Sequence, residues 1–135
     1  MQQSNHQIRV EKKLVDGKPV LQLVLETCEI HGLPFLPGFD STNHTTILDE
    51  VSWDADEVVL SAKIEGMDYT LSYGTIPEGK PGCDMKEFAV KADARLLNGE
   101  DVGPMVGTLL GMFATGNGVA SENEAAFEYF TYRRM

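Results

Sequence analysis

The 135-residue chain lacks several features that would mark whole classes of protein. It has only two cysteines, Cys28 and Cys83, which show no spacing typical of a metal site and are expected to be free thiols. No apolar run is long enough to span a membrane, and the first residues show no signal-peptide pattern. We therefore expect a cytoplasmic protein that makes no use of a membrane.

Basic residues are also scarce, since 11 lysines and arginines stand against 21 acidic residues and give a formal net charge of −10. An acidic surface repels phosphate backbones, which excludes nucleic acid as an expected partner. The three histidines lack the short spacings of a zinc site. No internal repeat or linker divides the chain, so residues 1–135 are predicted to form one domain with one core.

What is present is a series of short apolar segments separated by turn residues. A hairpin signal at residues 16–19 lies between two predicted strands. Regular turns between short strands favour an all-β protein, an antiparallel β-sandwich. The predicted strands cover residues 7–14, 20–25, 47–53, 57–65, 67–74 and 85–92, with loops at 32–43 and 75–84 and a short helical or irregular piece at 93–100.

The last third of the chain predicts two further strands around a turn. Gly116-Asn117-Gly118 is a turn tripeptide, because glycine adopts positive φ freely and asparagine tolerates it. Short apolar runs precede it, and from Phe127 to Tyr132 aromatic side chains fall on both faces of a strand. Ring area on both faces needs cover, so this terminal strand is expected to lie inside a sheet.

This same region resembles a known protein family. The residues that carry the likeness are Gly107-x3-Gly111-Met112-Phe113-Ala114-Thr115-Gly116-Asn117-Gly118 and Ala125-Ala126-Phe127-Glu128-Tyr129-Phe130-Thr131-Tyr132. They are similar to the end of the C-terminal concanavalin A-like sandwich of family 43 glycoside hydrolases, the β-xylosidases and arabinofuranosidases. The family pattern has Leu-Tyr in place of Met112-Phe113 and Asp in place of Glu128. A looser likeness covers most of residues 47–132, and it implies a concanavalin A-like jelly roll.

The resemblance implies an accessory role. In that family the catalytic carboxylates belong to a separate five-bladed propeller that no segment here resembles, so no catalytic residue is assigned to this chain. The implied function is a noncatalytic module linked to hydrolysis of xylan-derived oligosaccharides. One loop of the family's sandwich leans an aromatic side chain toward the substrate; the matching positions here are Pro104 and Met105. Met105 offers a soft apolar wall without a ring, or it is simply the first core residue of its strand.

The resemblance also implies partners. A glycosidase propeller is one, with a xylo-oligosaccharide as the associated sugar. The family's sandwich is typically longer than this chain, with additional strands before the matched part. A sandwich with fewer strands leaves sheet edges open, and open edges invite pairing with another chain, so a homo-oligomer is the other expectation.

The alternative function is an independent carbohydrate-binding, lectin-like module. Trp53 beside two aspartates, or Phe35 and Phe39 in the 32–43 loop, would supply aromatic platforms for a sugar ring. The simpler interpretation places Trp53 in the core, in phase with Val51, and has the two phenylalanines cap one end of the sandwich. A self-contained enzyme ranks below both.

No cofactor is expected, and the alternative is a structural calcium ion. Its oxygen ligands would come from loop acids, and a turn with solvated acids is the simpler interpretation. The acids concerned are Asp54, Asp56, Glu57, Asp84, Glu100 and Asp101.

Overall fold

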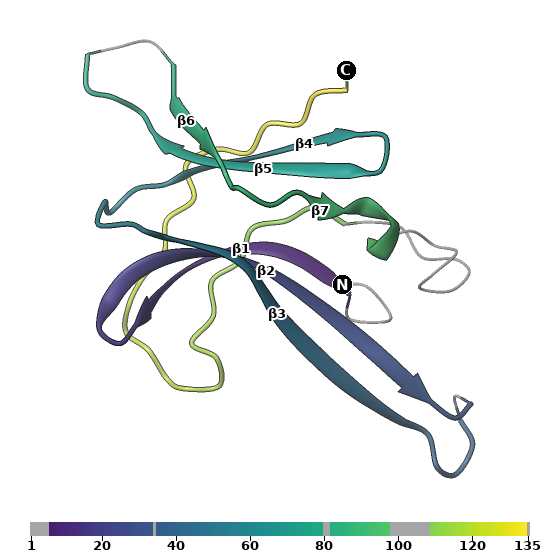
Figure 1. Ribbon diagram of the computed structural model, residues 1–135. Coiled ribbons are helices and arrows are strands. Elements are labelled where there is room, and N and C mark those ends of the chain that lie inside the picture. Colours follow the sequence, from purple (N-terminus) through teal and green to yellow (C-terminus); the bar gives the residue numbers. More distant parts are fainter. Residues whose placement is uncertain (1–5, 34, 80–81, 98–108, 135) are drawn as a thin grey trace.

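The computed structural model describes residues 6–33, 35–79, 82–97 and 109–134, and the regular secondary structure of these residues is almost wholly β-strand (Figure 1). Its elements are β1 (Gln7–Val15), β2 (Lys18–His31), β3 (Asp40–Ser52), β4 (Val59–Glu65), β5 (Asp68–Thr75), β6 (Asp84–Glu87), β7 (Ala92–Asp93) and the 3₁₀ turn η1 (Ala94–Leu97). No helix within these described ranges is long and apolar enough to cross a bilayer.

The strands form two antiparallel sheets, one stacked on the other in Figure 1. Sheet A has the order β1-β2-β3 and sheet B the order β4-β5-β6, with the short β7 pairing with β5 as well. Two antiparallel sheets closing over a shared core confirm the predicted β-sandwich class.

The hairpin predicted at residues 16–19 is present between β1 and β2. Asp16 and Gly17 both have positive φ, at 51° and 75°, as a two-residue type I′ turn requires. The register runs without a break from Val15 opposite Lys18 to Gln7 opposite Glu26. The turn chemistry therefore sets the register of the first two strands.

The core lies between the two sheets and is centred on β2. Leu21 and Leu23 have no exposed surface, and they join a cluster with side chains of sheet B. On the opposite face of β2, Val20 and Val24 are also buried. Because β2 is covered on both faces, it contributes more buried apolar side chains than any other described strand. The other members of the cluster are Tyr69 and Leu71 of β5, Phe88 between β6 and β7, Ala92 of β7 and Leu97 of η1.

The predicted loop over 32–43 is only partly right. β2 continues to His31 and β3 starts at Asp40, so the loop is confined to the tip of a long two-stranded hairpin that leaves the body of the molecule (Figure 1). In this outer part of the hairpin, backbone pairing between the strands holds the strand structure in place of burial. The paired residues run from Glu26 opposite Thr45 to His31 opposite Asp40. Apolar alternation therefore did not reveal it.

The predicted strand over 85–92 is divided in two. The backbone N–H of Phe88 donates to the carbonyl oxygen of Leu71 at 3.0 Å, and that of Ala89 donates to Asp49 Oδ2 of sheet A at 2.8 Å. The chain thus leaves β5 after Phe88 and pairs with it again only at β7. This detour buries the Phe88 ring between the sheets.

Neither predicted C-terminal strand is present within residues 109–134, although the turn between them is right; the beginning of the first one lies outside the described residues. Asn117 and Gly118 have φ values of 55° and 81°, and the N–H of Val119 donates to the carbonyl oxygen of Gly116 at 3.0 Å. On either side of this turn, residues 109–134 contain no strand, and the Phe127 side chain is 52% exposed instead of lying in mid-sheet. The alternating pattern predicted an extended chain correctly, but it could not supply the neighbouring strand that would pair with it.

Candidate functional site

A concave site lies where the chain passes from sheet A to sheet B. We call it the Trp53 hollow; it has a volume of about 270 Å³. It is lined by Ser52 at the end of β3 and Trp53, Asp54 and Ala55 after it, by Tyr73, Gly74 and Thr75 of β5, and by Asp84 and Lys86 of β6. Of the positions singled out in the sequence, Trp53, Asp54 and Asp84 therefore meet in one place.

Trp53 is held firmly at the wall of this hollow. Its backbone N–H donates to the carbonyl oxygen of Pro19 at 3.0 Å, and its indole Nε1–H donates to that of Glu57 at 3.1 Å. Its ring meets Tyr73 edge-on, with centroids 5.6 Å apart and an interplanar angle of 87°. The half-buried ring packs against the core cluster with one side and leaves the rest of its surface open.

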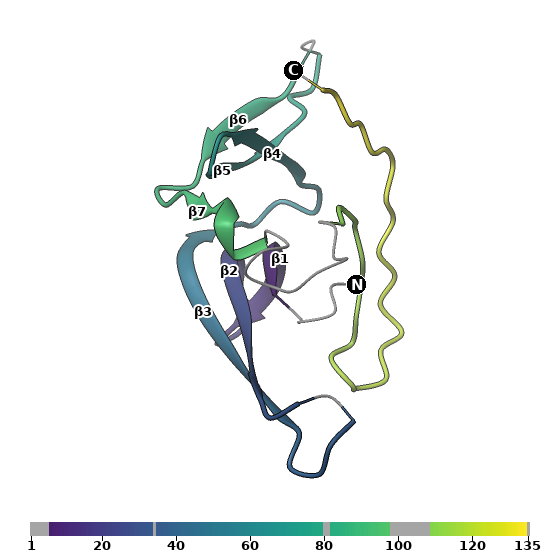
Figure 2. The same cartoon turned by 90° about the vertical axis from the view of Figure 1, so that its right-hand side faces the viewer.

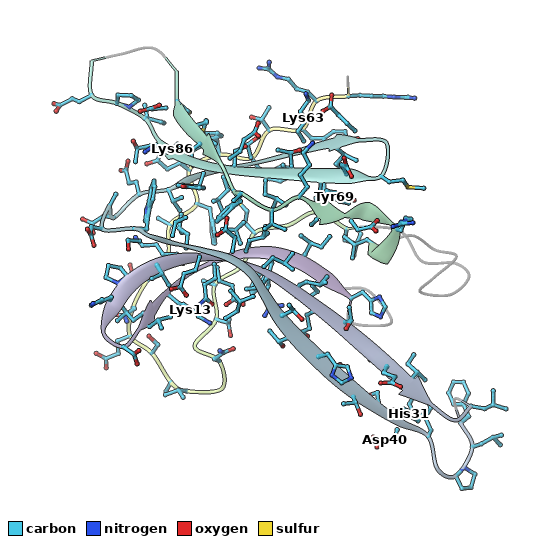
Figure 3. The ribbon with its side chains drawn as sticks, viewed as in Figure 1. Lys13, His31, Asp40, Lys63, Tyr69 and Lys86 are labelled. Carbon is cyan, nitrogen blue, oxygen red and sulfur yellow. The ribbon has the colours of Figure 1, made fainter. Side chains whose placement is uncertain are left out.

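The chemistry of the hollow is that of a polar site with aromatic walls. Lys86 lies opposite Tyr73 in the β5–β6 register, and the labelled Lys86 can be followed on sheet B in Figure 3. Asp54 and Asp84 add carboxylate acceptors, so donors and acceptors for hydroxyl groups adjoin two rings. That combination suits a small polyhydroxylated ligand such as a sugar.

The close approach of β5 and β6 at one end of the hollow depends on Gly74. A Cβ added there would lie 2.1 Å from the carbonyl oxygen of Asp84 and 2.8 Å from Met85 Sδ. Only glycine lets the two strands come so close. Sequence inspection did not identify this position.

Phe35 and Phe39 are far from the Trp53 hollow and do not cap the sandwich, so the capping interpretation is wrong. They sit at the tip of the β2–β3 hairpin, beyond the labelled His31 and Asp40 in Figure 3. Phe35 is 102% exposed, with a φ of 71°. At about 3.3 Å per residue, the length of β3 separates this tip from Trp53 by about 40 Å. The two aromatic platforms therefore cannot form one site.

One family comparison decides what kind of domain this is. The family described as beta xylosidase C-terminal concanavalin A-like domain matches residues 1–133. The chain belongs to this family. Searches of curated proteins and of solved structures returned no match. Family membership rests on the whole matched length, so it stands even though Phe127 does not lie within a sheet.

In this xylosidase-type domain, the residues predicted to face the substrate lie outside the described ranges. Pro104 and Met105 belong to the segment 98–108, as do the acids Glu100 and Asp101. Their roles stay predictions.

Among the described residues, no side chains are grouped as calcium ligands would be. Across them, no three histidine, cysteine or carboxylate side chains are placed to hold one metal ion. At the candidate turn, Lys12 Nζ donates to the carbonyl oxygens of Ala55 and Asp56, at 2.7 and 2.8 Å. The turn that carries Asp54 and Asp56 thus already has a cationic partner from β1. No sequence pattern indicated this contact.

Away from the Trp53 hollow, arginines pair with carboxylates on both sheets. Arg9 pairs with Glu11 and, at 2.9 Å, with Glu26. Burial alone would raise the pKa of Glu11, but the hydrogen bond and charge of Arg9, with a contribution from Lys13, outweigh it and hold the pKa below its usual value. At the end of β7, hydrogen bonds from Arg95 lower the pKa of Asp93 as well.

Proposed function

We propose that this member of the β-xylosidase C-terminal domain family is a noncatalytic accessory module linked to the hydrolysis of xylan-derived oligosaccharides. The observation that carries the proposal is the family match over residues 1–133, joined to a two-sheet sandwich. The activity itself belongs to a partner, a family 43 catalytic propeller.

The carboxylates support the noncatalytic part of this proposal. Glycoside hydrolysis needs two carboxyl groups across the scissile bond, one of them with a raised pKa so that it can donate a proton. An arginine lowers the pKa of Glu11, and another lowers the pKa of Asp93. An arginine-paired carboxylate is a poor proton donor, so these groups fit a structural role.

A direct test uses a family 43 β-xylosidase propeller whose own C-terminal sandwich has been deleted. We expect the purified chain to bind this propeller in calorimetric titration and to raise its melting temperature, because a cognate surface covers what deletion exposed. A Leu23→Ala chain, weakened in its core, is the control and should bind less well. Absence of binding by the intact chain would contradict the accessory role.

Sugar binding at the Trp53 hollow is the second candidate function. The observation that favours it is the meeting of Trp53 and Tyr73 with Asp54, Asp84 and Lys86 around one concave site. In this mode a pyranose would lie against the exposed part of the rings, while the charged groups bind its hydroxyls.

Trp53 is the only tryptophan in the chain, so its fluorescence reports on this site alone. Titration with xylo- and arabino-oligosaccharides should change its emission and release heat. Asp84→Asn should weaken the response, whereas Phe35→Ala at the distant hairpin tip should leave it unchanged. No change in fluorescence or heat at millimolar sugar, a threshold equivalent to about −4 kcal/mol, would rule this mode out.

A further inference from the structure

A single loop joins the two sheets and also forms one wall of the Trp53 hollow. We call residues 53–58, between the end of β3 and the start of β4, the crossover; it carries the chain from sheet A to sheet B (Figure 2). Trp53, Asp54 and Ala55 line the hollow from this loop. The shape of the hollow therefore depends on where the crossover lies.

The crossover has little of its own to hold it in one place. Ala55 and Asp56 lie between strands, so no ladder takes up their carbonyl groups. Asp54, Asp56 and Glu57 are exposed acids close together in this short loop, and their charges repel one another. Such a loop keeps a fixed position only if another part of the chain binds it.

Lys12 of β1 provides that contact. Its Nζ donates to the carbonyl oxygen of Ala55 at 2.7 Å and to that of Asp56 at 2.8 Å. Both distances are those of hydrogen bonds strengthened by a charge on the donor. One ammonium group thus binds two successive carbonyl oxygens and brings a positive charge to an acidic loop.

The register of sheet A explains why Lys12 and not its neighbour makes this contact. Lys12 lies opposite Leu21 of the core cluster, and facing residues of an antiparallel pair project from the same side of the sheet. The Lys12 side chain therefore points toward sheet B. Lys13, labelled in Figure 3, projects from the other face and pairs with Glu11 at 3.4 Å.

The position of the crossover also sets the position of the Trp53 ring. The indole Nε1–H donates to the carbonyl oxygen of Glu57, the residue that follows the pair bound by Lys12. The backbone N–H of Trp53 is fixed separately, by the carbonyl oxygen of Pro19. Lys12 thus holds the part of the loop to which the ring is hydrogen-bonded, yet it is not among the residues that line the hollow.

We propose that Lys12 is a positioning residue of the Trp53 hollow: without touching the ligand, it keeps the crossover in the arrangement that accepts a sugar. For its effect on affinity this inference rests on the proposed sugar binding, whereas its effect on the loop rests on the hydrogen bonds alone. A residue of this kind raises affinity by preorganisation, because a loop that is already ordered costs less to bind.

Loss of the Lys12 contact should loosen the loop and leave the sandwich folded, because Lys12 is exposed and lies outside the core cluster. When the binding arrangement is populated for only a fraction of the time, the apparent dissociation constant rises by the inverse of that fraction. A crossover that is in place for about one-tenth of the time would bind sugar about tenfold more weakly.

The test uses two variants of Lys12 and one matched control. Lys12→Met keeps an unbranched stem and removes the ammonium, whereas Lys12→Arg keeps a positive charge and several donors. The control, Lys13→Met, removes the same charge from the adjacent position of β1.

The first readout needs no sugar and is the quenching of Trp53 fluorescence by acrylamide. We expect the quenching constant to rise in Lys12→Met, because a looser crossover exposes the ring more often. Lys12→Arg and Lys13→Met should match the wild-type chain. Urea titration checks that each variant is folded under these conditions.

The second readout is the dissociation constant for xylo-oligosaccharides, from the change in Trp53 emission. Lys12→Met should raise it about tenfold and Lys12→Arg by less than about threefold, while Lys13→Met should leave it unchanged.

Each other outcome has a definite meaning. Unchanged quenching in Lys12→Met would overturn the inference, as would a looser loop with unchanged sugar affinity. An equal effect in Lys13→Met would assign the change to net charge, and a Lys12→Arg variant as impaired as Lys12→Met would show that the bonds to the carbonyl oxygens are not its source. A wild-type chain that binds no sugar would contradict the proposed sugar binding, and the quenching comparison would still decide whether Lys12 holds the crossover.

Discussion

At the scale of single residues, the absence of a side chain at Gly74 allows β5 and β6 to pack closely. Gly74→Ala would place a methyl group 2.1 Å from the carbonyl oxygen of Asp84, so β5 and β6 must separate. We expect a loss of about 2 kcal/mol in the free energy of unfolding, measured by urea titration. Gly111→Ala is the control: nothing lies within 4 Å of its added Cβ, and its stability should match the wild type within about 0.5 kcal/mol. Equal losses in both variants would contradict this account.

Glu11 gives a residue-scale prediction for pH. Its pKa is lowered in the folded protein, so its contribution is complete above the unfolded value of about 4.3 and is lost as pH falls through the lower, folded value. Because both partners are partly exposed, Glu11→Gln should destabilise by only about 0.5 kcal/mol at neutral pH, and by less at a pH of about 3.

The matched control is Glu65→Gln, which removes the same charge from an exposed pair with Lys63. Its effect should be near zero at both pH values. A Glu11→Gln deficit that stays constant or grows on acidification, in urea titrations at the two pH values, would show that the ion pair with Arg9 is not its source.

Sequence patterns identified some residues of the candidate site and missed others for physical reasons. Trp53 was found because tryptophan is rare and its phase with Val51 is visible along one strand. Lys12 and Lys86 were missed because their neighbours at the site are far away in the sequence. Lys12 contacts the turn after β3, Lys86 lies opposite Tyr73 of β5, and no local sequence pattern indicates either contact. Gln22 is similar, a buried polar residue of β2 whose Nε2 contacts Glu50 of β3.

At the scale of elements, stability is concentrated in β2. Leu23 is fully buried, so Leu23→Ala removes apolar contacts and leaves a cavity, with an expected cost of about 3 kcal/mol. Leu14→Ala is the control, because Leu14 is 70% exposed at the end of β1 and should change stability by less than about 0.5 kcal/mol. Denaturant midpoints of the two variants test this; similar shifts would contradict a core centred on β2.

Turn residues predicted elements better than apolar runs did. The turns at 16–17 and 116–118, and the break at Gly66 between β4 and β5, are all present because positive φ is a local requirement that local residues report. The outer halves of β2 and β3 were missed because pairing, not burial, holds them. The strand predicted at 127–132 is wrong for the complementary reason: alternation sets an extended chain but not its partner.

At the scale of the whole molecule, the sandwich class and the family both followed from the sequence. Motifs around Gly116 and Phe127 indicated the family, which the match over residues 1–133 confirms. What the sequence did not reveal is how unevenly apolar side chains are buried, with a dense core around β2 and exposed apolar side chains in residues 109–134.

The most direct measurement of the central claim is the rate of nitrophenyl xyloside hydrolysis in three samples: this chain alone, a stripped family 43 propeller alone, and the two combined. The account predicts no turnover by the chain alone and a higher kcat/KM for the mixture than for the propeller. Turnover by the purified chain, or a mixture no faster than the propeller, would contradict a noncatalytic accessory role.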